Sequence, residues 1–398
     1  MNRVVITGVA PIAAMGQGQE FFDNLMAMKP VVKQTDENYC KGANVSKWYV
    51  PYPDINFTPY RDKLLQMPIL APLIAKSAAV STIMALDDAK LKELDPDTPV
   101  FFGFSTPNAD ENFNAYNTIK AGKRLHPSAN LKCMGNAISA WISILFGIHG
   151  KSKVISTACA SGTDAIGEAY EHICMGKSKT AICGASDMTK SDENMIFRSF
   201  DVLGTLTHSD DGKPRPFSEE RSGFLFCEGG ACALILEEYE SALARGADIY
   251  AEITGYRSCC DGYHIVKMPD YPEQVIKMLK SLSAGKNVDY YNAHGTATSV
   301  NDQMETTALT ETFGEHAANI IINATKCMTG HAIGTSSAYE AAVTAYSIKN
   351  GIVHGNILGT PMEGFNLPQE TTHCDIRCAI TASFGFGGHN SALMMEKV

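Results

Sequence analysis

The sequence predicts a layered α/β protein, and three observations support this prediction. Short β-like runs alternate with helical patterns along all 398 residues, which is typical of α/β layers. The chain is too long for one simple core, so we expect two units of similar size. Segments 228–238 and 386–397 each contain Gly-Gly, an apolar run and a glutamate. This weak echo hints at an internal duplication, with each segment ending one half.

Ten runs of apolar and β-branched residues are predicted as strands, because each is short and most are followed by glycine or small polar residues. They cover 3–8, 98–104, 153–157, 179–185, 231–238, 250–256, 288–294, 319–325, 377–383 and 391–397. Helical periodicity appears at 68–90, 162–176, 272–284 and 336–349. The segment 35–60 is rich in Tyr, Pro and Asn and is interpreted as a surface excursion.

Composition narrows the function classes. The net charge of −10 and the lack of a Lys/Arg-rich run argue against a nucleic-acid binder. No apolar stretch reaches membrane-spanning length, and the first apolar run predicts a strand rather than a signal peptide. We therefore expect a cytoplasmic protein without a membrane partner. Twelve cysteines, none in a Cys-x-x-Cys pair, predict buried thiols rather than disulfides or a metal site; this interpretation includes Cys183, Cys227, Cys232, Cys259 and Cys260.

One cysteine lies where a β-like run turns into a helix, in VISTACASGTDAIGEAY (154–170). A helix start lowers a thiol pKa and favours the nucleophilic thiolate. The small neighbours of Cys159 leave room for a substrate. On this stretch alone, a buried structural cysteine fits equally well.

Further polar residues follow other predicted strands. His294 ends one strand, before a Gly-Thr-x-Thr loop, and Lys326 and His331 follow the next one. A single histidine is more often structural, but sites in layered α/β folds gather at the carboxyl ends of strands. A Cys/His group suits acyl transfer through a thioester. The glycine turn at 385–388 could direct N–H groups at an oxyanion, or could be an ordinary hairpin turn.

Four motifs, in this order, resemble the elongating β-ketoacyl-acyl carrier protein synthases of the thiolase superfamily. They are TACASGTDAIGEA, NAHGTATSVND, TKCMTGH with a glutamate downstream, and SFGFGGHN. The resemblance covers nearly the whole chain. It implies a five-layer α-β-α-β-α fold made of two similar halves. Residues 1–250 would carry the nucleophilic cysteine and residues 251–398 the two histidines.

The resemblance also implies an activity, the decarboxylative condensation of an acyl thioester with malonyl-carrier protein in fatty-acid or polyketide synthesis. Cys159 would hold the acyl group. His294 and His331 would promote decarboxylation and stabilise the enolate. Lys326 and Glu340 would form a buried pair that orients the site.

In the same family, the oxyanion hole would be formed by the backbone N–H groups of Cys159 and Phe386, with Phe386 as the gate to the acyl pocket. Thr296 and Thr298 would bind the phosphopantetheine arm of the acyl carrier protein. The resemblance implies no cofactor of the enzyme's own and no metal. It implies a homodimer, or a heterodimer with a non-condensing chain-length factor.

The chain departs from the family pattern near the expected acyl pocket. Phe104, Thr106 and Pro107 replace a Gly-rich turn, Trp141 replaces a smaller residue, and GASD (184–187) replaces Gly-Gly-x-Glu. We expect Phe104 and Trp141 to line the acyl channel, Pro107 to stiffen it, and the enzyme to prefer short or unusual acyl groups.

Two related functions are less consistent with these motifs. A thiolase would need a second cysteine in the C-terminal glycine turn, and the turn here has none. A chain-length factor would lack the nucleophile. An active subunit that works beside such a factor stays open.

Overall fold

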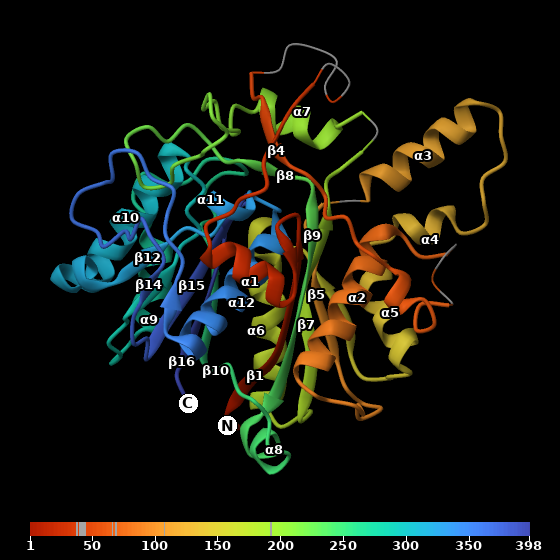
Figure 1. Ribbon diagram of the computed structural model, residues 1–398, viewed down its shortest axis with the longest axis horizontal. Helices are drawn as coiled ribbons and strands as arrows, with labels where there is room; N and C mark the ends of the chain where they lie inside the picture. The colour runs from red at the N-terminus through yellow and green to blue at the C-terminus, as the bar shows by residue number, and fades with distance from the viewer. Residues whose placement is uncertain (37–38, 40–44, 66, 68–69, 107, 192) are drawn as a thin grey trace.

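The structure is a computed structural model that describes residues 1–398 except 37–38, 40–44, 66, 68–69, 107 and 192 (Figure 1). Among the described residues, no helix is long and apolar enough to cross a membrane. Pro107 and part of the predicted surface excursion lie outside the described residues.

Five strands form the first half of the sheet system. They are β1 (Val4–Ala13), β5 (Val100–Gly103), β6 (Ser152–Ile155), β7 (Thr180–Met188) and β9 (Gly229–Glu238). Their spatial order is β6-β5-β7-β9-β1. β5 pairs in parallel with β6 and β7, whereas β9 is antiparallel to β7 and β1. The carboxyl ends of β5, β6 and β7 therefore meet at one edge.

Five later strands repeat this arrangement. They are β10 (Ala251–Cys260), β11 (Tyr290–Asn292), β12 (Ile321–Asn323), β15 (Cys378–Gly385) and β16 (His389–Glu396). Their order, β12-β11-β15-β16-β10, matches that of the first set strand for strand. β9 and β16, which share the Gly-Gly echo, occupy equivalent places. The two sets join through antiparallel pairing of β1 with β10.

The helices form three layers around these strands, as Figure 1 shows. α6 (Ser161–Cys174) and α12 (Gly334–Asn350) pack against each other between the two sets. α2 (Leu73–Asp88) covers the outer face of the first set and packs against α5 (Ala137–Phe146). α9 (Glu273–Leu282) covers the second set and packs against α10 (Ser299–Phe313). The predicted five-layer α-β-α-β-α architecture is confirmed.

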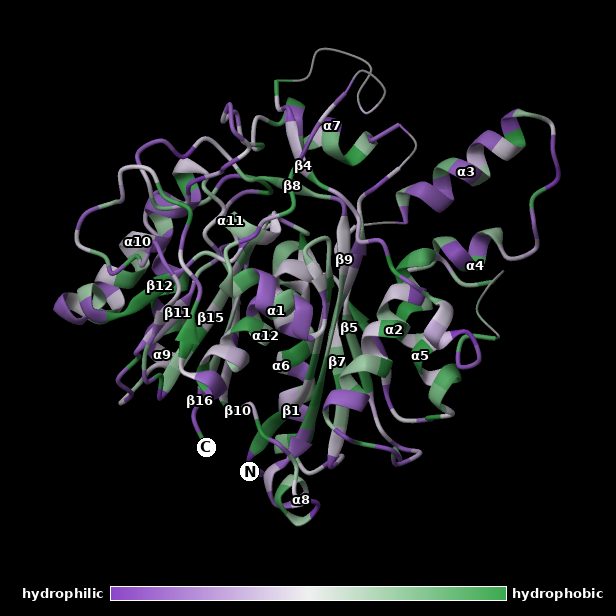
Figure 2. Ribbon diagram, in the orientation of Figure 1, coloured by the Kyte–Doolittle hydropathy of each residue, from purple (hydrophilic) through white to green (hydrophobic). Residues whose placement is uncertain are grey.

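Shorter elements connect these layers. They are β2 (Gly16–Gln17), α1 (Gln19–Met26), β3 (Lys33–Gln34), β4 (Trp48–Val50), α3 (Ala109–Lys120), α4 (Ala129–Cys133), α7 (Met195–Val202), β8 (Phe226–Cys227), α8 (Tyr239–Ala244), α11 (Lys326–Thr329), β13 (Ile352–Val353) and β14 (Thr372–His373), with 3-10 turns at Thr58–Tyr60, Ala158–Ala160 and Gly314–Asn319. In Figure 2 the central strands are mostly hydrophobic, whereas α3, which projects from the body, is mostly hydrophilic.

Of the eleven cysteines that the structure describes, seven are buried as predicted and four are not. Cys183, Cys227 and Cys232 are fully enclosed, but Cys259 is only partly buried and Cys260 is exposed. The prediction for these last two residues is wrong because the final four residues of β10 are largely exposed or only partly covered.

Candidate active site

Cys159 lies in a single 3-10 turn between β6 and α6. The preceding Ala158 has φ 52, a left-handed conformation that non-glycine residues rarely adopt and that is often found at functional sites. Small neighbours make the turn possible: a Cβ on Gly103 would lie 2.5 Å from the backbone carbon of Ser161. The thiol is 5% exposed, so it lies at the bottom of the site rather than on the surface.

The electrostatic environment of Cys159 differs from the prediction. A helix start was expected to lower its pKa, but burial raises the pKa of Cys159 to about 12, and the nearby Lys326 and the N–H of Phe386 offset only part of this shift. Burial is the largest cause, because the sulfur is enclosed by protein and a thiolate there would lose its solvation. The resting residue is therefore a thiol, and it needs a neighbouring base to become a nucleophile.

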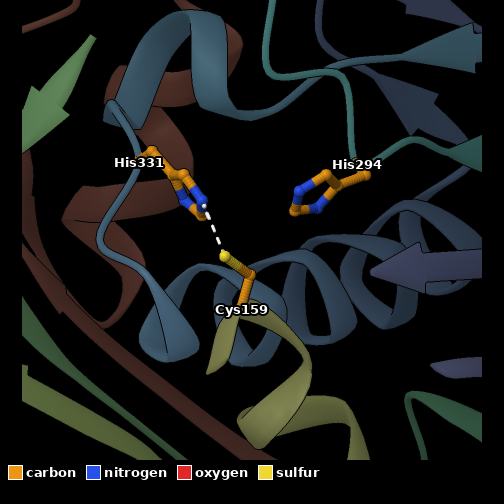
Figure 3. Close-up of side chains that lie close together, drawn as sticks. All are labelled: Cys159, His294 and His331. Carbon is orange, nitrogen blue, oxygen red and sulfur yellow. Dashed lines mark hydrogen bonds between the residues drawn. The ribbon is translucent and has the colours of Figure 1, made fainter. Parts of the chain in front are cut away.

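His331 supplies such a neighbour. Its Nε2 lies 3.2 Å from the Cys159 Sγ (Figure 3). Its Nδ1 lies 3.3 Å from the Ser336 Oγ, which also accepts the N–H of Ala332. Because the Ser336 hydroxyl can rotate, it can donate to Nδ1 or accept from it. Ser336 thus supports both neutral tautomers of His331, one with Nε2 as proton acceptor and one with Nε2 as donor.

His294 faces the same space from the end of β11. The two imidazole rings are 5.5 Å apart and nearly perpendicular, and Figure 3 shows both rings turned toward the cysteine. The Glu305 carboxylate on α10 accepts the backbone N–H groups of His294 and Gly295, at 2.8 and 2.9 Å. Burial lowers the pKa of both histidines, and Lys326 adds to the shift. Both rings are therefore neutral at neutral pH.

Lys326 and Glu340 form a buried ion pair beside these side chains. Burial raises the pKa of the Glu340 carboxyl to about 7, although Lys326 opposes this shift. The structure brings the two residues together as the resemblance implied. A buried pair of this kind is weak evidence for stability and better evidence for positioning.

The C-terminal glycine turn closes over the thiol. The backbone N–H of Phe386 faces the Cys159 sulfur. A Cβ on Gly385 would lie 2.8 Å from the Thr157 carbonyl oxygen and 3.1 Å from the Cys159 nitrogen, so only glycine permits this approach. The Phe386 ring stacks on Phe200, with centroids 6.2 Å apart.

A cavity of about 520 Å³ leads to these groups, and its lining includes Cys159, His294, His331 and Phe386. Thr296 and Thr298 also line it, and their hydroxyl oxygens are 3.0 Å apart. The Thr298 hydroxyl additionally caps α10 by accepting the N–H of Asn301. Three Cys/His ligand atoms, from Cys159, His294 and His331, lie within 4.8 Å of one another, a spacing that could also hold a metal ion such as Zn²⁺.

Two predicted pocket residues do not reach this cavity. Phe104 is absent from its lining and packs over Gly135, where a Cβ would lie 3.0 Å from the ring. Trp141 packs into the apolar cluster that α2 forms on the outer face of the first set of strands. Their direction could not be known from sequence. The predicted preference for short or unusual acyl groups rested on these two residues and on Pro107, which lies outside the described residues, and it stays a prediction.

Three buried carboxylates and one hydroxyl were missed by the sequence analysis. Asp302 accepts the N–H groups of Phe217 and Ala297, and Glu305 supports His294. They lie three residues apart, a spacing that puts two side chains on one face of a helix and was a usable signal, although no helix was predicted there. Asp187 was noted only as part of GASD (184–187), and its role was missed because its partners are distant in sequence. Ser336 had no signal, because its contacts depend on the local turn.

The comparisons with known proteins agree with this geometry. Residues 70–242 match the N-terminal domain of β-ketoacyl synthases and residues 250–359 match their C-terminal domain. The 3-oxoacyl-(acyl-carrier-protein) synthase 2 of Synechocystis sp. is 32% identical, over 100% of this chain and 98% of its own.

Two solved structures are also similar over the full chain. One is a type II polyketide synthase ketosynthase, bound to the hexaketide and in complex with its acyl-carrier protein, with TM-score 0.88 and 28% identity over 100% of this chain and 99% of that one. The other is the ishigamide ketosynthase/chain length factor, with TM-score 0.88 and 26% identity over the same shares. The chain therefore belongs to the β-ketoacyl synthase family and is a condensing transferase.

Proposed function

We propose that Cys159 accepts an acyl group from an acyl carrier protein and passes it to the carbanion formed from malonyl-carrier protein. The observation that carries this proposal is the 3.2 Å contact between the Cys159 Sγ and the His331 Nε2, beside a second neutral histidine in one cavity. A thiol, a proton acceptor and a hydrogen-bond donor are the groups that thioester exchange and enolate formation need.

The first half-reaction exchanges one thioester for another. His331 takes the thiol proton as the Cys159 sulfur attacks the acyl carbonyl carbon. The carbon–sulfur bond to the carrier breaks, and the departing carrier thiolate takes the proton from His331. The transient oxyanion lies near the N–H groups of Cys159 and Phe386, which supply donors where negative charge develops.

The second half-reaction forms the new carbon–carbon bond. The malonyl carboxylate leaves as carbon dioxide, and its electron pair passes into the thioester as an enolate. His294 and His331 donate hydrogen bonds to the enolate oxygen, which neutral imidazoles can do through Nε2–H. The enolate carbon then attacks the acyl carbonyl of Cys159. The Cys159 thiolate leaves and takes a proton from solvent, so that the β-ketoacyl chain remains on the carrier.

The remaining site residues support these steps. The Lys326 ammonium stabilises negative charge near Cys159 and both histidines, and Glu340 holds it in place. Thr296 and Thr298 line the approach to the thiol, where they would bind the polar phosphopantetheine arm of the carrier. The enzyme then needs no cofactor of its own, because the carrier brings the reactive thioester.

We also propose that the chain consists of halves 1–250 and 251–398 and that it works as a homodimer. The repeated strand order supports the two halves. Exposed apolar side chains on α3, α4 and α5 support a protein partner on that side. Of these helices, α5 packs on the edge strand β6, α4 contacts α5, and α3 contacts α4. A second copy of this chain would give the homodimer, and a related chain, as in the ishigamide ketosynthase/chain length factor, would give the heterodimer.

Intact-mass analysis tests the function. Incubation with acyl-carrier protein should add one acyl group, and peptide mapping should place it on Cys159. The Cys159→Ala variant should stay unmodified, whereas Cys183→Ala, which removes a buried thiol away from the site, should load normally. An adduct on another cysteine with Cys159 unmodified would contradict the mechanism.

A second readout separates the half-reactions. His294→Ala should release carbon dioxide from malonyl-carrier protein about 100-fold more slowly, because it removes one donor from the enolate, yet still load Cys159. His316→Ala is the matched control, since that ring bonds the Val288 carbonyl outside the site. Wild-type decarboxylation by His294→Ala would assign the role to another group.

A further inference from the structure

Asp187, at the end of β7, is a buried carboxylate that the reaction above does not use. Its Oδ1 accepts the N–H and the hydroxyl of Ser105, at 2.9 and 2.7 Å, and the N–H of Thr106 at 3.3 Å. Its Oδ2 accepts the N–H and the hydroxyl of Thr335, at 2.9 and 3.2 Å. Burial raises the pKa of the Asp187 carboxyl, and these hydrogen bonds oppose the shift. Five donors facing two oxygens suit an ionised carboxylate.

These hydrogen bonds hold a strained turn. Ile333 has φ 51 and ψ −118, a conformation that a β-branched residue adopts only when its surroundings enforce it. Asp187 holds the N–H of Thr335, two residues further along. The Ser105 hydroxyl donates to Asp187 and accepts the N–H of Gly334 at 3.1 Å. Both residues that follow Ile333 are therefore fixed, directly or through Ser105, by one carboxylate.

The same turn carries His331 and touches the nucleophile turn. A Cβ on Gly334 would lie 3.0 Å from the Asp187 Oδ2 and 3.1 Å from the carbonyl oxygen of Ala158. Gly334 is thus packed between the carboxylate and the strained residue before Cys159. Any shift of this turn changes the distance between His331 and Cys159.

We propose that Asp187 is a positioning residue, whose carboxylate clamps the Ile333 turn and so sets the separation of the His331 Nε2 from the Cys159 Sγ. This proposal rests on the proposed function, because it concerns the same pair of atoms. Asp187, Ser105 and Thr335 do not line the cavity, so the clamp acts on the rate of reaction rather than on substrate binding.

Asp187→Asn tests the clamp. Either orientation of the amide places its NH₂ group against at least two donors, which opens the turn. We expect kcat for condensation to fall about 100-fold, the scale of a misplacement of about 1 Å, while KM stays within about twofold. Asp88→Asn is the matched control, because that carboxylate also accepts a backbone N–H and a tyrosine hydroxyl away from the site.

Ser105→Ala is a milder second variant that removes only the relay to Gly334. It should lower kcat several-fold without changing KM. Its control is Ser81→Ala, since the Ser81 hydroxyl bridges Ala10 and Ala233 in the same manner outside the site. If Asp187→Asn does not fold, Ser105→Ala decides: a wild-type kcat in this variant overturns the proposal.

The pH profile of Cys159 alkylation by iodoacetamide separates a clamp from a merely structural residue. Burial is the main cause of the raised pKa of the Cys159 thiol; Lys326 opposes it, and the charges of Asp187 and Glu340 add to it. The neutral His294 and His331 also face the thiol.

Because it removes one negative charge, Asp187→Asn should shift the alkylation profile to lower pH while condensation slows. Ser105→Ala should leave the profile unchanged. An unshifted profile and a wild-type kcat in Asp187→Asn overturn the proposal. If wild-type protein fails to load Cys159, the proposed function itself is wrong.

Discussion

Cys159, His294 and His331 are uncharged at neutral pH, because burial disfavours the charged form of each. This matters for the proposed sequence of steps. A neutral thiol survives until a thioester arrives, and neutral imidazoles can both accept and donate a proton. The sequence identified all three residues by their places at strand ends, but it predicted the wrong direction for the thiol pKa. Burial of a side chain depends on the whole fold, which a local motif does not report.

A further buried histidine makes the stability of the protein pH-dependent. His354 Nδ1 lies 2.7 Å from the Gly355 carbonyl and its Nε2 lies 3.2 Å from the Thr325 hydroxyl. Burial lowers the pKa of His354 from 6.5 to about 4. The unfolded chain therefore binds a proton between pH 6.5 and 4 that the folded chain does not, and stability falls as pH falls through this window.

We expect His354→Gln to remove this contribution, which amounts to about 3 kcal/mol. In urea unfolding, the free energy of unfolding of the wild type should fall by this amount relative to that of the variant when the pH is lowered from 7 to 4. The comparison is needed because the Glu305 and Glu340 carboxyls, with pKa values raised to about 7 by burial, act in the opposite sense. His316→Gln is the control, and parallel curves for wild type and His354→Gln would contradict the argument.

The strand ends carry most of the site. β6, β11, β12 and β15 each end beside one of its motifs, and this placement was predictable because strand periodicity and terminal glycines are local signals. The sequence did not predict the side-chain orientations of Phe104 and Trp141, or the hydrogen-bond partners of Asp187. They depend on contacts between segments far apart in the sequence, as when Asp187 meets Thr335.

The end of β15 gives a prediction about close backbone approach. In Gly385→Ala the new Cβ would meet the Thr157 carbonyl oxygen at 2.8 Å, so the strand end must move away from Cys159. The Phe386 N–H would move with it, and loss of an oxyanion donor costs about 100-fold or more in rate. We therefore expect acyl loading to fall by this factor while the far-ultraviolet circular dichroism is unchanged.

The control for this variant is Gly135→Ala, whose Cβ would meet only the Phe104 ring, at 3.0 Å. A side chain can yield where a backbone carbonyl cannot, so this variant should load at nearly the wild-type rate. Wild-type loading by Gly385→Ala would show that the close approach is not needed.

At the scale of the whole molecule, the site belongs to both sets of strands. Cys159 follows a strand of the first set, and His294 and His331 follow strands of the second. α6 and α12 pack directly against each other between the sets, so the nucleophile and the histidine loop are held by one contact. A gene duplication would explain the repeated strand order. In the sequence, the repeat is visible only as the Gly-Gly similarity between 228–238 and 386–397.

The outer side of the first set gives a prediction about assembly. β6 is the last strand of its sheet and packs against α5. α4 contacts α5, and α3 contacts α4. Apolar side chains on α3 and α4 are exposed: Tyr116 by 58%, Ile119 by 60% and Leu131 by 57%. Monomeric proteins rarely expose several large apolar residues together. We therefore expect native mass spectrometry to give twice the 43.0 kDa chain mass. The double variant Tyr116→Glu plus Ile119→Glu should dissociate the dimer.

The control is the double variant Tyr263→Glu plus Ile265→Glu, at exposed apolar residues beside the cavity, which should leave the dimer intact. A wild-type monomer that pairs only with a related non-condensing chain would instead establish the heterodimer, because the same face would then be reserved for a different partner.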